Sequence, residues 1–106
     1  MVHKSEIQAL ADRIAKAFKP ERIILFGSYP SGDPSPDSDV DLLVVLPHRE
    51  KGWRVATQIR QSVGSPFAMD LLVRTPEQVL ERLALGDPFV KEIVERGYVL
   101  YEGARD

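Results

Sequence analysis

Apolar residues are spaced along the chain in two ways, one typical of amphipathic helices and the other of buried strands. Apolar side chains recur at helical spacing in residues 5–18, 49–63, 75–83 and 87–97. Short apolar runs in residues 22–26, 40–46 and 67–73 predict strands, and residues 98–101 fit a short edge strand. Because strands and helices alternate, the pattern predicts an α/β fold in which helices cover a small sheet.

The helical stripes also predict which side chains face the interior. The inward positions are Ile7, Leu10, Ile14, Ala17 and Phe18 in the first helix, Trp53, Ala56, Ile59 and Val63 in the second, Val79, Leu80 and Leu83 in the third, and Phe89, Val90, Ile93 and Val94 in the fourth. The first stripe could line either a core or a partner surface, and we favour the core because a small domain needs every apolar stripe it has. Strand 40–46 is apolar at positions of both parities, which indicates a central strand.

Local signals predict where several elements begin and end. Thr75 is a capping residue, with proline at the first helical position and Gln78 able to close a capping box. Asp87 starts the last helix in the same way, again before a proline, and Gly97 is its C-terminal stop. Residues 102–106 are expected to form a frayed tail.

Candidate chemistry lies between the first two predicted strands. Gly27 and Ser28 follow the apolar run that ends at Phe26. Glycine permits a close approach of the backbone, and Ser28 is placed to cap a short helix with Pro30 in its first turn. A strand-to-helix turn of this kind offers backbone N–H groups and a hydroxyl to a phosphate. Gly27 and Ser28 are therefore candidate phosphate-binding residues.

Two aspartates, Asp39 and Asp41, stand at the start of the second predicted strand. Since alternate side chains of a strand point to one face, the two carboxylates are expected to lie side by side. Neighbouring carboxylates repel each other and are costly to desolvate. Mg²⁺ would remove that penalty, because it prefers carboxylate, water and phosphate oxygens. A phosphate-binding turn combined with metal-binding carboxylates is the equipment of phosphoryl or nucleotidyl transfer.

Asp70 is a third acidic residue of interest, since it interrupts an otherwise apolar strand. A carboxylate inside such a strand needs a partner. One interpretation is an ion pair with Arg22 or Arg74. The other interpretation places Asp70 on a strand beside Asp39 and Asp41, where it would complete an acidic triad.

Composition narrows the classes of function that are open to the chain. Its 106 residues suit one domain with a modest core. The net charge of −2 argues against a general nucleic-acid binder, and the absence of cysteine rules out disulfides and thiolate metal sites. No apolar run approaches the roughly 18 residues of a membrane span, and the N-terminus lacks a signal-peptide core. We therefore expect a cytoplasmic protein that binds neither membranes nor free nucleic acid.

The pair Gly27 and Ser28, followed after ten intervening residues by Asp39 and Asp41, resembles the signature of the DNA-polymerase-beta-like nucleotidyltransferases. The short length and the flanking apolar runs look like the minimal nucleotidyltransferases, a group that includes the MntA-type antitoxins paired with HEPN-domain toxins. The resemblance implies a nucleotidyltransferase fold, with a small mixed sheet flanked by helices. It also implies that residues 1–106 form a single minimal nucleotidyltransferase domain.

The resemblance further implies roles for the candidate residues. Asp39 and Asp41 would bridge two Mg²⁺ ions about 3.5–4 Å apart, and Asp70 would help to hold one of them. Gly27 and Ser28 would bind the terminal phosphates of ATP, while AMP passes to a hydroxyl group and pyrophosphate leaves. Asp70 would also help to take the proton of that hydroxyl.

The acceptor of the nucleotide is expected on another molecule, because the chain ends where larger nucleotidyltransferases would add a substrate-binding domain. By resemblance to the HEPN-paired antitoxins, the expected acceptor is a tyrosine of a HEPN toxin, and the chain would act as an antitoxin through AMPylation. Two alternatives stay open. One is a catalytically weak or inactive fold that neutralises the toxin by binding, and the other is a nucleotidyltransferase that modifies RNA or a small molecule. A homo-oligomer is compatible with the sequence, though no feature requires one.

One departure from the family pattern concerns positive charge. Many minimal members carry basic residues directly after the glycine–serine pair, whereas residues 29–32 of this chain are Tyr-Pro-Ser-Gly. Two charges that would hold the triphosphate are therefore missing. Lys51, Arg54 and Arg74 are candidates to compensate, although Lys51, Arg54 and Arg60 also fit a solvated helix face.

Overall fold

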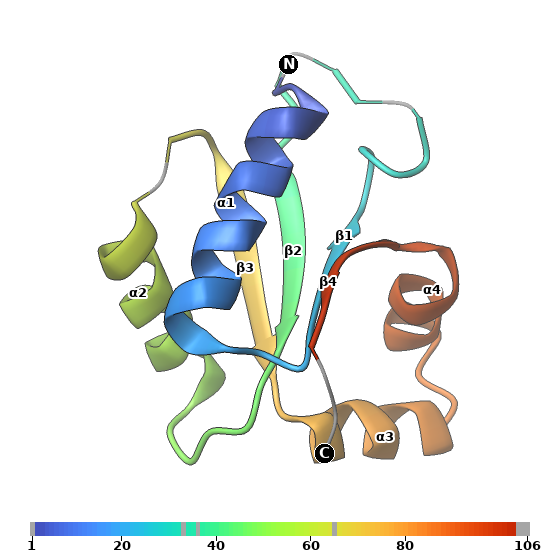
Figure 1. Cartoon of the computed structure of the whole chain (residues 1–106). Coiled ribbons are helices and arrows are strands. Elements are labelled where there is room, and N and C mark those ends of the chain that lie inside the picture. The colour runs from blue at the N-terminus through green and yellow to red at the C-terminus, as the bar shows by residue number, and fades with distance from the viewer. Residues whose placement is uncertain (1, 33, 36, 65, 104–106) are drawn as a thin grey trace.

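The computed structural model describes residues 2–32, 34–35, 37–64 and 66–103. Its helices are α1 (Lys4–Phe18), α2 (Gly52–Val63), α3 (Pro76–Ala84) and α4 (Pro88–Arg96). Its strands are β1 (Arg22–Phe26), β2 (Val40–Val45), β3 (Met69–Arg74) and β4 (Tyr98–Glu102). Figure 1 shows these elements along the chain in the order α1, β1, β2, α2, β3, α3, α4, β4. The predicted α/β arrangement is confirmed.

The strands form one sheet in the order β3-β2-β1-β4. β2 and β3 run parallel, whereas β1 pairs antiparallel with both β2 and β4. The sheet is therefore mixed, as the resemblance implied, and β2 has the interior position that its apolar run predicted. The edge strand predicted at 98–101 is present and extends to Glu102, so the expected frayed tail does not begin at that residue. Residues 104–106 lie outside the described residues.

Helices cover both faces of the sheet, and each face has its own hydrophobic core (Figure 1). On the α1–α2 face, the two central strands contribute Ile23, Leu25, Val40, Leu42 and Val44. On the α3–α4 face, they contribute Ile24, Leu43 and Val45. Neighbouring residues of a strand point to opposite faces, so a strand that is covered on both sides needs an unbroken apolar run.

The predicted stripe of α1 closes the first core. Ile7, Leu10 and Ile14 are at most 1% exposed. They pack against the sheet and α2 as part of one buried cluster. The core interpretation of this stripe is therefore confirmed.

Within the described residues, no helix has the length and apolar character needed to cross a membrane.

The helix caps read from the sequence are confirmed. The Thr75 hydroxyl accepts from the Gln78 backbone N at 3.1 Å, and the Thr75 backbone N donates to the Gln78 side chain at 2.9 Å. Asp87 Oδ1 accepts from the Phe89 backbone N at 2.9 Å, and Gly97 is the C-cap of α4. These caps fix where α3 and α4 begin and end between β3 and β4.

Some side chains predicted to face inward are exposed instead: Trp53 at 64%, Leu80 at 67% and Phe89 at 53%, together with Ala17. In α2, Val55 rather than Trp53 completes the buried stripe, because Val55 lies about one turn before Ile59. α3 buries Val79, and the next residue, Leu80, is rotated by about 100° around the helix axis. These helices therefore bury narrower stripes than the sequence suggested.

The short helix that Ser28 was predicted to cap is absent, and residues 27–32 form turns instead. Gly32 has a φ of +81°, which is incompatible with a continuing helix. Pro30 and Pro34 also lack the backbone donors that a helical ladder needs. The remaining differences are in element bounds: α2 begins at Gly52 rather than residue 49, β2 ends one residue early, and β3 is shifted to residues 69–74.

Candidate active site

The candidate site lies at the end of the sheet where β1 passes into its turn and β2 begins. Phe26, Asp41 and Asp70 are directly paired positions on β1, β2 and β3. Asp41 and Asp70 have the parity of Leu43 and Leu72, whose side chains join the α3–α4 core. Because alternate residues of a strand share a face, both carboxylates belong to the α3–α4 side of the sheet.

The carboxyl group of Asp41 is partly buried among like charges. Its pKa is raised from 3.8 to about 6, first by burial and then by the charge of Asp70, a side-chain hydrogen bond with Asp70 and the charge of Asp39. Each of these influences disfavours the ionised form of the carboxyl group. Asp39 is exposed and lies one residue before β2. The chain thus brings Asp41 and Asp70 together and keeps Asp39 within electrostatic reach.

Asp70 meets another acid rather than a base. In the described part of the chain, no ion pair joins it to Arg22 or Arg74. Arg74 stands four residues further along β3, roughly 13 Å away by strand rise, and donates to the Val73 carbonyl oxygen at 2.8 Å. Among the described residues, no group of three His, Cys, Asp or Glu side chains is gathered closely enough to hold a metal ion. The structure therefore pairs Asp41 with Asp70, and the participation of Asp39 in a metal-binding triad stays a prediction.

Gly27 brings the backbone directly against Asp41. Its φ is +80°, a conformation that L side chains rarely adopt. A Cβ atom at this position would overlap Oδ2 of Asp41. Two reasons therefore require glycine at position 27: the backbone conformation, and the Asp41 carboxylate that occupies the space of a Cβ atom.

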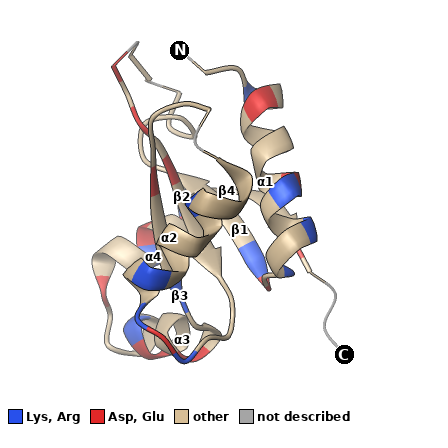
Figure 2. Ribbon diagram, turned by 90° about the vertical axis from the view of Figure 1, so that its left-hand side faces the viewer, with Lys and Arg blue, Asp and Glu red and all other residues tan. Residues whose placement is uncertain are grey.

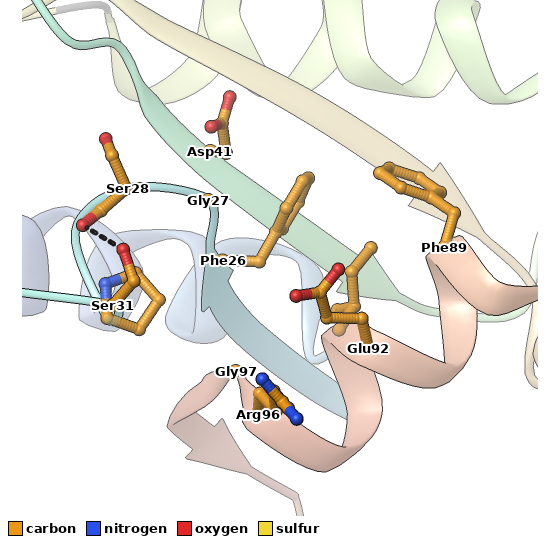
Figure 3. Close-up of a pocket in the computed structure, with 11 residues that line it drawn as sticks. Phe26, Gly27, Ser28, Ser31, Asp41, Phe89, Glu92, Arg96 and Gly97 are labelled. Atoms are coloured by element: carbon orange, nitrogen blue, oxygen red, sulfur yellow. Dashed lines mark hydrogen bonds between the residues drawn. The ribbon is translucent and has the colours of Figure 1, made fainter. Parts of the chain in front are cut away.

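Hydrogen bonds and packing hold the turn that follows Gly27. Ser31 Oγ donates to the Ser28 carbonyl oxygen at 2.9 Å, the contact drawn as a dashed line in Figure 3. The Tyr29 hydroxyl accepts from the backbone N of Val2 at 3.1 Å, and the Tyr29 ring packs against the α1–α2 core. The turn thus holds Ser28 beside the end of β1 without a helix.

The turn and Asp41 line one side of an open cleft of about 740 Å³. The lining residues are Phe26, Gly27, Ser28, Pro30, Ser31 and Asp41, and, from α4 and its end, Phe89, Glu92, Ile93, Arg96 and Gly97. Figure 3 shows Phe89, Glu92 and Arg96 on α4 as the wall that faces the end of β1 and the turn. The Phe89 ring meets Phe26 edge to face, with centroids 5.8 Å apart and planes at 86°. This contact accounts for the outward position of Phe89.

Sequence reasoning missed the α4 wall. Phe89, Glu92 and Arg96 recur at intervals of three and four residues, the spacing of one helix face. That spacing could have grouped the three residues, but it could not show that this face turns toward the start of β2. The sequence interpretation used the same helix only as a core element.

The basic residues expected to compensate for the missing charges do not line the cleft. Arg54 lies over the Trp53 ring at 5.5 Å, on the first turn of α2. α2 begins against the Val73 carbonyl oxygen near the far end of β3, where a Cβ on Gly52 would come within 2.5 Å of that oxygen. Figure 2 shows the basic segments of α1 on the opposite side of the sheet from α4, so α1 does not supply cations to the cleft either.

Comparison with known proteins gives a family match along nearly the whole chain. A sequence model described as "Nucleotidyltransferase domain" matches residues 7–101, which include all five candidate site residues. No curated protein matches the chain significantly.

Solved structures share the fold at low sequence identity. One is a crystal structure of a presumed nucleotidyltransferase from Sulfolobus solfataricus, with a TM-score of 0.65 and 17% identity over 92% of this chain and 78% of that chain. Another is a crystal structure of the MntA–HpeT toxin–antitoxin, in a mutant with two aspartates replaced by glutamate. Its TM-score is 0.53, with 21% identity over 98% of this chain and 76% of that chain. Both likenesses concern the fold alone.

Proposed function

The chain belongs to the nucleotidyltransferase domain family, and from this premise we propose that it transfers AMP from ATP to a hydroxyl group of a partner protein. The observation that carries the proposal is the pairing of Asp41 with Asp70 beside the Gly27 backbone. Asp41 lines the open cleft, and its carboxylate and that of Asp70 repel each other unless a cation or a proton is bound there. A carboxyl group with a raised pKa that lines a cleft, as Asp41 does, is typical of functional sites.

The proposed reaction forms one bond and breaks another. The oxygen of the acceptor hydroxyl bonds to the α-phosphorus of ATP, and the bond from that phosphorus to the α–β bridging oxygen breaks. Pyrophosphate leaves with the bridging oxygen, and the hydroxyl proton passes to the Asp70 carboxylate. Asp70 suits this role better than Asp41 because it is the exposed member of the pair. Gly27 and Ser28 bind the terminal phosphates through the backbone and the serine hydroxyl.

The acidic residues fit Mg²⁺ in their chemistry. Asp39, Asp41 and Asp70 supply the hard oxygen donors that this ion prefers, and a bound cation offsets the burial and the like-charge repulsion that raise the pKa of Asp41. Mg²⁺ would be held by the adjacent Asp41 and Asp70, with the charge of Asp39 within electrostatic reach, and would neutralise charge on the phosphates and lower the pKa of the attacking hydroxyl. The chain itself holds the Asp41 and Asp70 carboxylates on one face of the sheet, next to Gly27, which has no side chain.

The partner that we propose is a HEPN-domain toxin, with a tyrosine hydroxyl as the acceptor. The chain would then act as an antitoxin. Support comes from the resemblance of the Gly27–Asp41 stretch to the MntA-type antitoxins, together with the fold shared with the MntA–HpeT toxin–antitoxin. The site also leaves room for a protein acceptor, because the cleft is open and Asp70 is exposed.

Isothermal titration tests the nucleotide site. Wild-type protein with Mg²⁺ is titrated with a non-hydrolysable ATP analogue, and the titration is repeated with Asp41→Asn and with Glu95→Gln. Glu95 is exposed on α4 and does not line the cleft, so its variant controls for the loss of one negative charge. We expect metal-dependent binding by the wild type and Glu95→Gln, and at least tenfold weaker binding by Asp41→Asn. Equal binding by all three proteins would contradict the proposed site.

Co-expression with the HEPN toxin tests the acceptor. Mass spectrometry of the toxin should find a tyrosine that is heavier by one AMP when the wild type is present. The Asp39→Ala/Asp41→Ala double variant should leave the same tyrosine unmodified. Finding the modified tyrosine in both samples would sink the proposal that these aspartates carry out the transfer.

A second candidate function is an antitoxin that neutralises by binding, with little turnover. It is favoured by the absence of basic residues in the 29–32 turn and by the incomplete gathering of the three acids. Growth protection separates the two functions. Protection that survives the Asp39→Ala/Asp41→Ala change indicates neutralisation by binding, whereas protection that is lost with the tyrosine modification indicates catalysis.

A further inference from the structure

α4 forms one wall of the cleft, and the reaction proposed above gives that wall no role. Arg96, in the last turn of the helix, is the basic residue among those that line the cleft. Its guanidinium makes no hydrogen bond or ion pair with any other described residue. Arg96 is also exposed, so its guanidinium is accessible to an anionic ligand that enters the cleft.

The position of Arg96 follows from the residue after it. A Cβ on Gly97 would overlap the carbonyl oxygen of Ile93 and come within 2.5 Å of Ile24 Cγ2 and 3.1 Å of the Leu25 carbonyl oxygen. Only glycine therefore allows the end of α4 to lie directly on β1. β1 ends one residue beyond Leu25, where the Gly27 turn begins. The close packing of Gly97 on β1 thus fixes Arg96 next to the phosphate-binding turn.

The negative charge of the cleft favours a cationic residue near the bound phosphates. The turn at 29–32 carries no cation, and Asp41 and Glu92 add negative charge to the lining of the cleft. The triphosphate of ATP is strongly anionic, so a cleft with only carboxylates and neutral groups would repel the phosphates that metal ions leave uncompensated. A guanidinium matches phosphate geometry with two parallel N–H donors.

We propose that Arg96 binds the terminal phosphates of the nucleoside triphosphate, in place of the basic residues missing from the turn. This inference rests on the proposed function, because it assigns a residue to the same nucleotide site. In Figure 3, Asp41, the Gly27–Ser31 turn and Arg96 lie around the same cleft, on β2, after β1 and on α4. A triphosphate bound in this cleft would have its α-phosphate near Asp41 and its terminal phosphates between the turn and Arg96.

Glu92 gives the cleft wall a direction. It lies one turn before Arg96 on α4 and lines the same cleft. Its carboxylate repels phosphates, whereas the hydroxyl and amino groups of a nucleoside can donate to it. The wall therefore favours an orientation with the phosphates at the Arg96 end and the nucleoside nearer Glu92 and Phe89.

The test compares Arg96→Gln with Lys91→Gln, a matched loss of one positive charge on the same helix. Lys91 is exposed and does not line the cleft. Each protein, with Mg²⁺ present, is titrated with the non-hydrolysable ATP analogue and with inorganic tripolyphosphate, which lacks a nucleoside. We expect Arg96→Gln to bind both probes about tenfold more weakly, as for the loss of a charge-assisted hydrogen bond. Lys91→Gln should bind them as the wild type does. Arg96→Lys should recover part of the loss, because it keeps the charge without the planar fork.

Failure of this inference can be told apart from failure of the proposed function. Undiminished binding of both probes by Arg96→Gln, with normal binding by the wild type, would overturn the assignment of Arg96 alone. Weaker binding of the analogue with unchanged binding of tripolyphosphate would also overturn it, because Arg96 would then contact the nucleoside. A wild type that binds neither probe would overturn the proposed function together with this inference. Gly97, which makes the close contact with β1, is unchanged in every variant, so the fold should be retained. Thermal melting of each variant checks this.

Discussion

Gly27 and Asp41 are in direct contact, with the backbone of the glycine against the carboxylate of the aspartate. Gly27 follows β1 and Asp41 lies on β2, with the whole turn-rich loop between them in sequence, yet the antiparallel register of β1 and β2 pairs Asp41 with Phe26, the residue before Gly27. The register alone brings the candidate phosphate-binding turn and the candidate metal-binding carboxylate together.

Gly27→Ala should abolish nucleotide binding, because the new methyl group displaces the Asp41 carboxylate. Gly32→Ala is the matched control. Gly27 and Gly32 have nearly the same φ, +80° and +81°, but a Cβ on Gly32 meets no atom of the described residues within 4 Å. Each variant should lose about 1–2 kcal/mol of stability from the strained backbone. Titration with the ATP analogue should then show binding by Gly32→Ala only, and equal loss in both variants would count against the contact with Asp41.

Asp41→Asn should stabilise the metal-free protein at neutral pH. The folded-state pKa of Asp41, about 6, lies above its ordinary value of 3.8, so ionisation opposes folding. The stabilising effect of the protonated carboxyl is complete below about pH 3.8 and is lost as the pH rises through about 6. Asparagine stays neutral throughout, so the variant should melt higher than the wild type at pH 7.5 in EDTA and about equally at pH 4.

Mg²⁺ gives the same prediction a second readout. Adding the ion at pH 7.5 should raise the melting temperature of the wild type, because a ligand that binds only the folded state stabilises it. The rise should be much smaller for Asp41→Asn and unchanged for Glu95→Gln, which alters the net charge equally outside the cleft. A wild type that melts as high as Asp41→Asn at pH 7.5 in EDTA, and that gains no stability from Mg²⁺, would argue against repulsion between the paired carboxylates.

The sequence predicted the elements well because the dominant signals are local. The apolar runs of β1 and β2 and the capping residues Thr75 and Asp87 act within a few residues, and all of them appear in the structure. Helix faces were predicted less well. Trp53 and Val55 are both apolar, and only the direction of approach of the sheet and α1 decides that Val55 is the buried one.

The candidate site shows the same division between local and tertiary information. The sequence pointed to Gly27, Asp41 and Asp70, since each interrupts or ends an apolar run. It could not give the register that pairs Asp41 with Asp70, because strand pairing joins residues far apart in the chain. It also gave no sign of Arg96, whose place in the cleft depends on how closely the end of α4 approaches β1.

Leu42→Ala should destabilise the fold far more than Trp53→Ala. Leu42 is fully buried on the α1–α2 face of β2, and Trp53 is 64% exposed. Removing the buried leucine should cost about 2–5 kcal/mol from lost burial and the cavity left behind. Removing the tryptophan should cost less than about 1 kcal/mol, mainly its contact with Arg54. Chemical denaturation measures both losses of stability. A larger loss for Trp53→Ala would show that Trp53 belongs to the core and that its exposed position is wrong.

Ser28→Ala should weaken nucleotide binding much less than Asp41→Asn. The Ser28 hydroxyl offers a single hydrogen bond to a charged phosphate, worth about 1–3 kcal/mol. The Ser28 carbonyl oxygen, which accepts from Ser31, is unaffected by the change, so the turn should keep its shape. Loss of the Asp41 charge instead removes a ligand that the bound cation and the phosphates both depend on. Titration of the two variants with the ATP analogue and Mg²⁺ should therefore give measurable binding for Ser28→Ala and little or none for Asp41→Asn. The reverse order would mean that the turn, rather than the carboxylate pair, dominates the site.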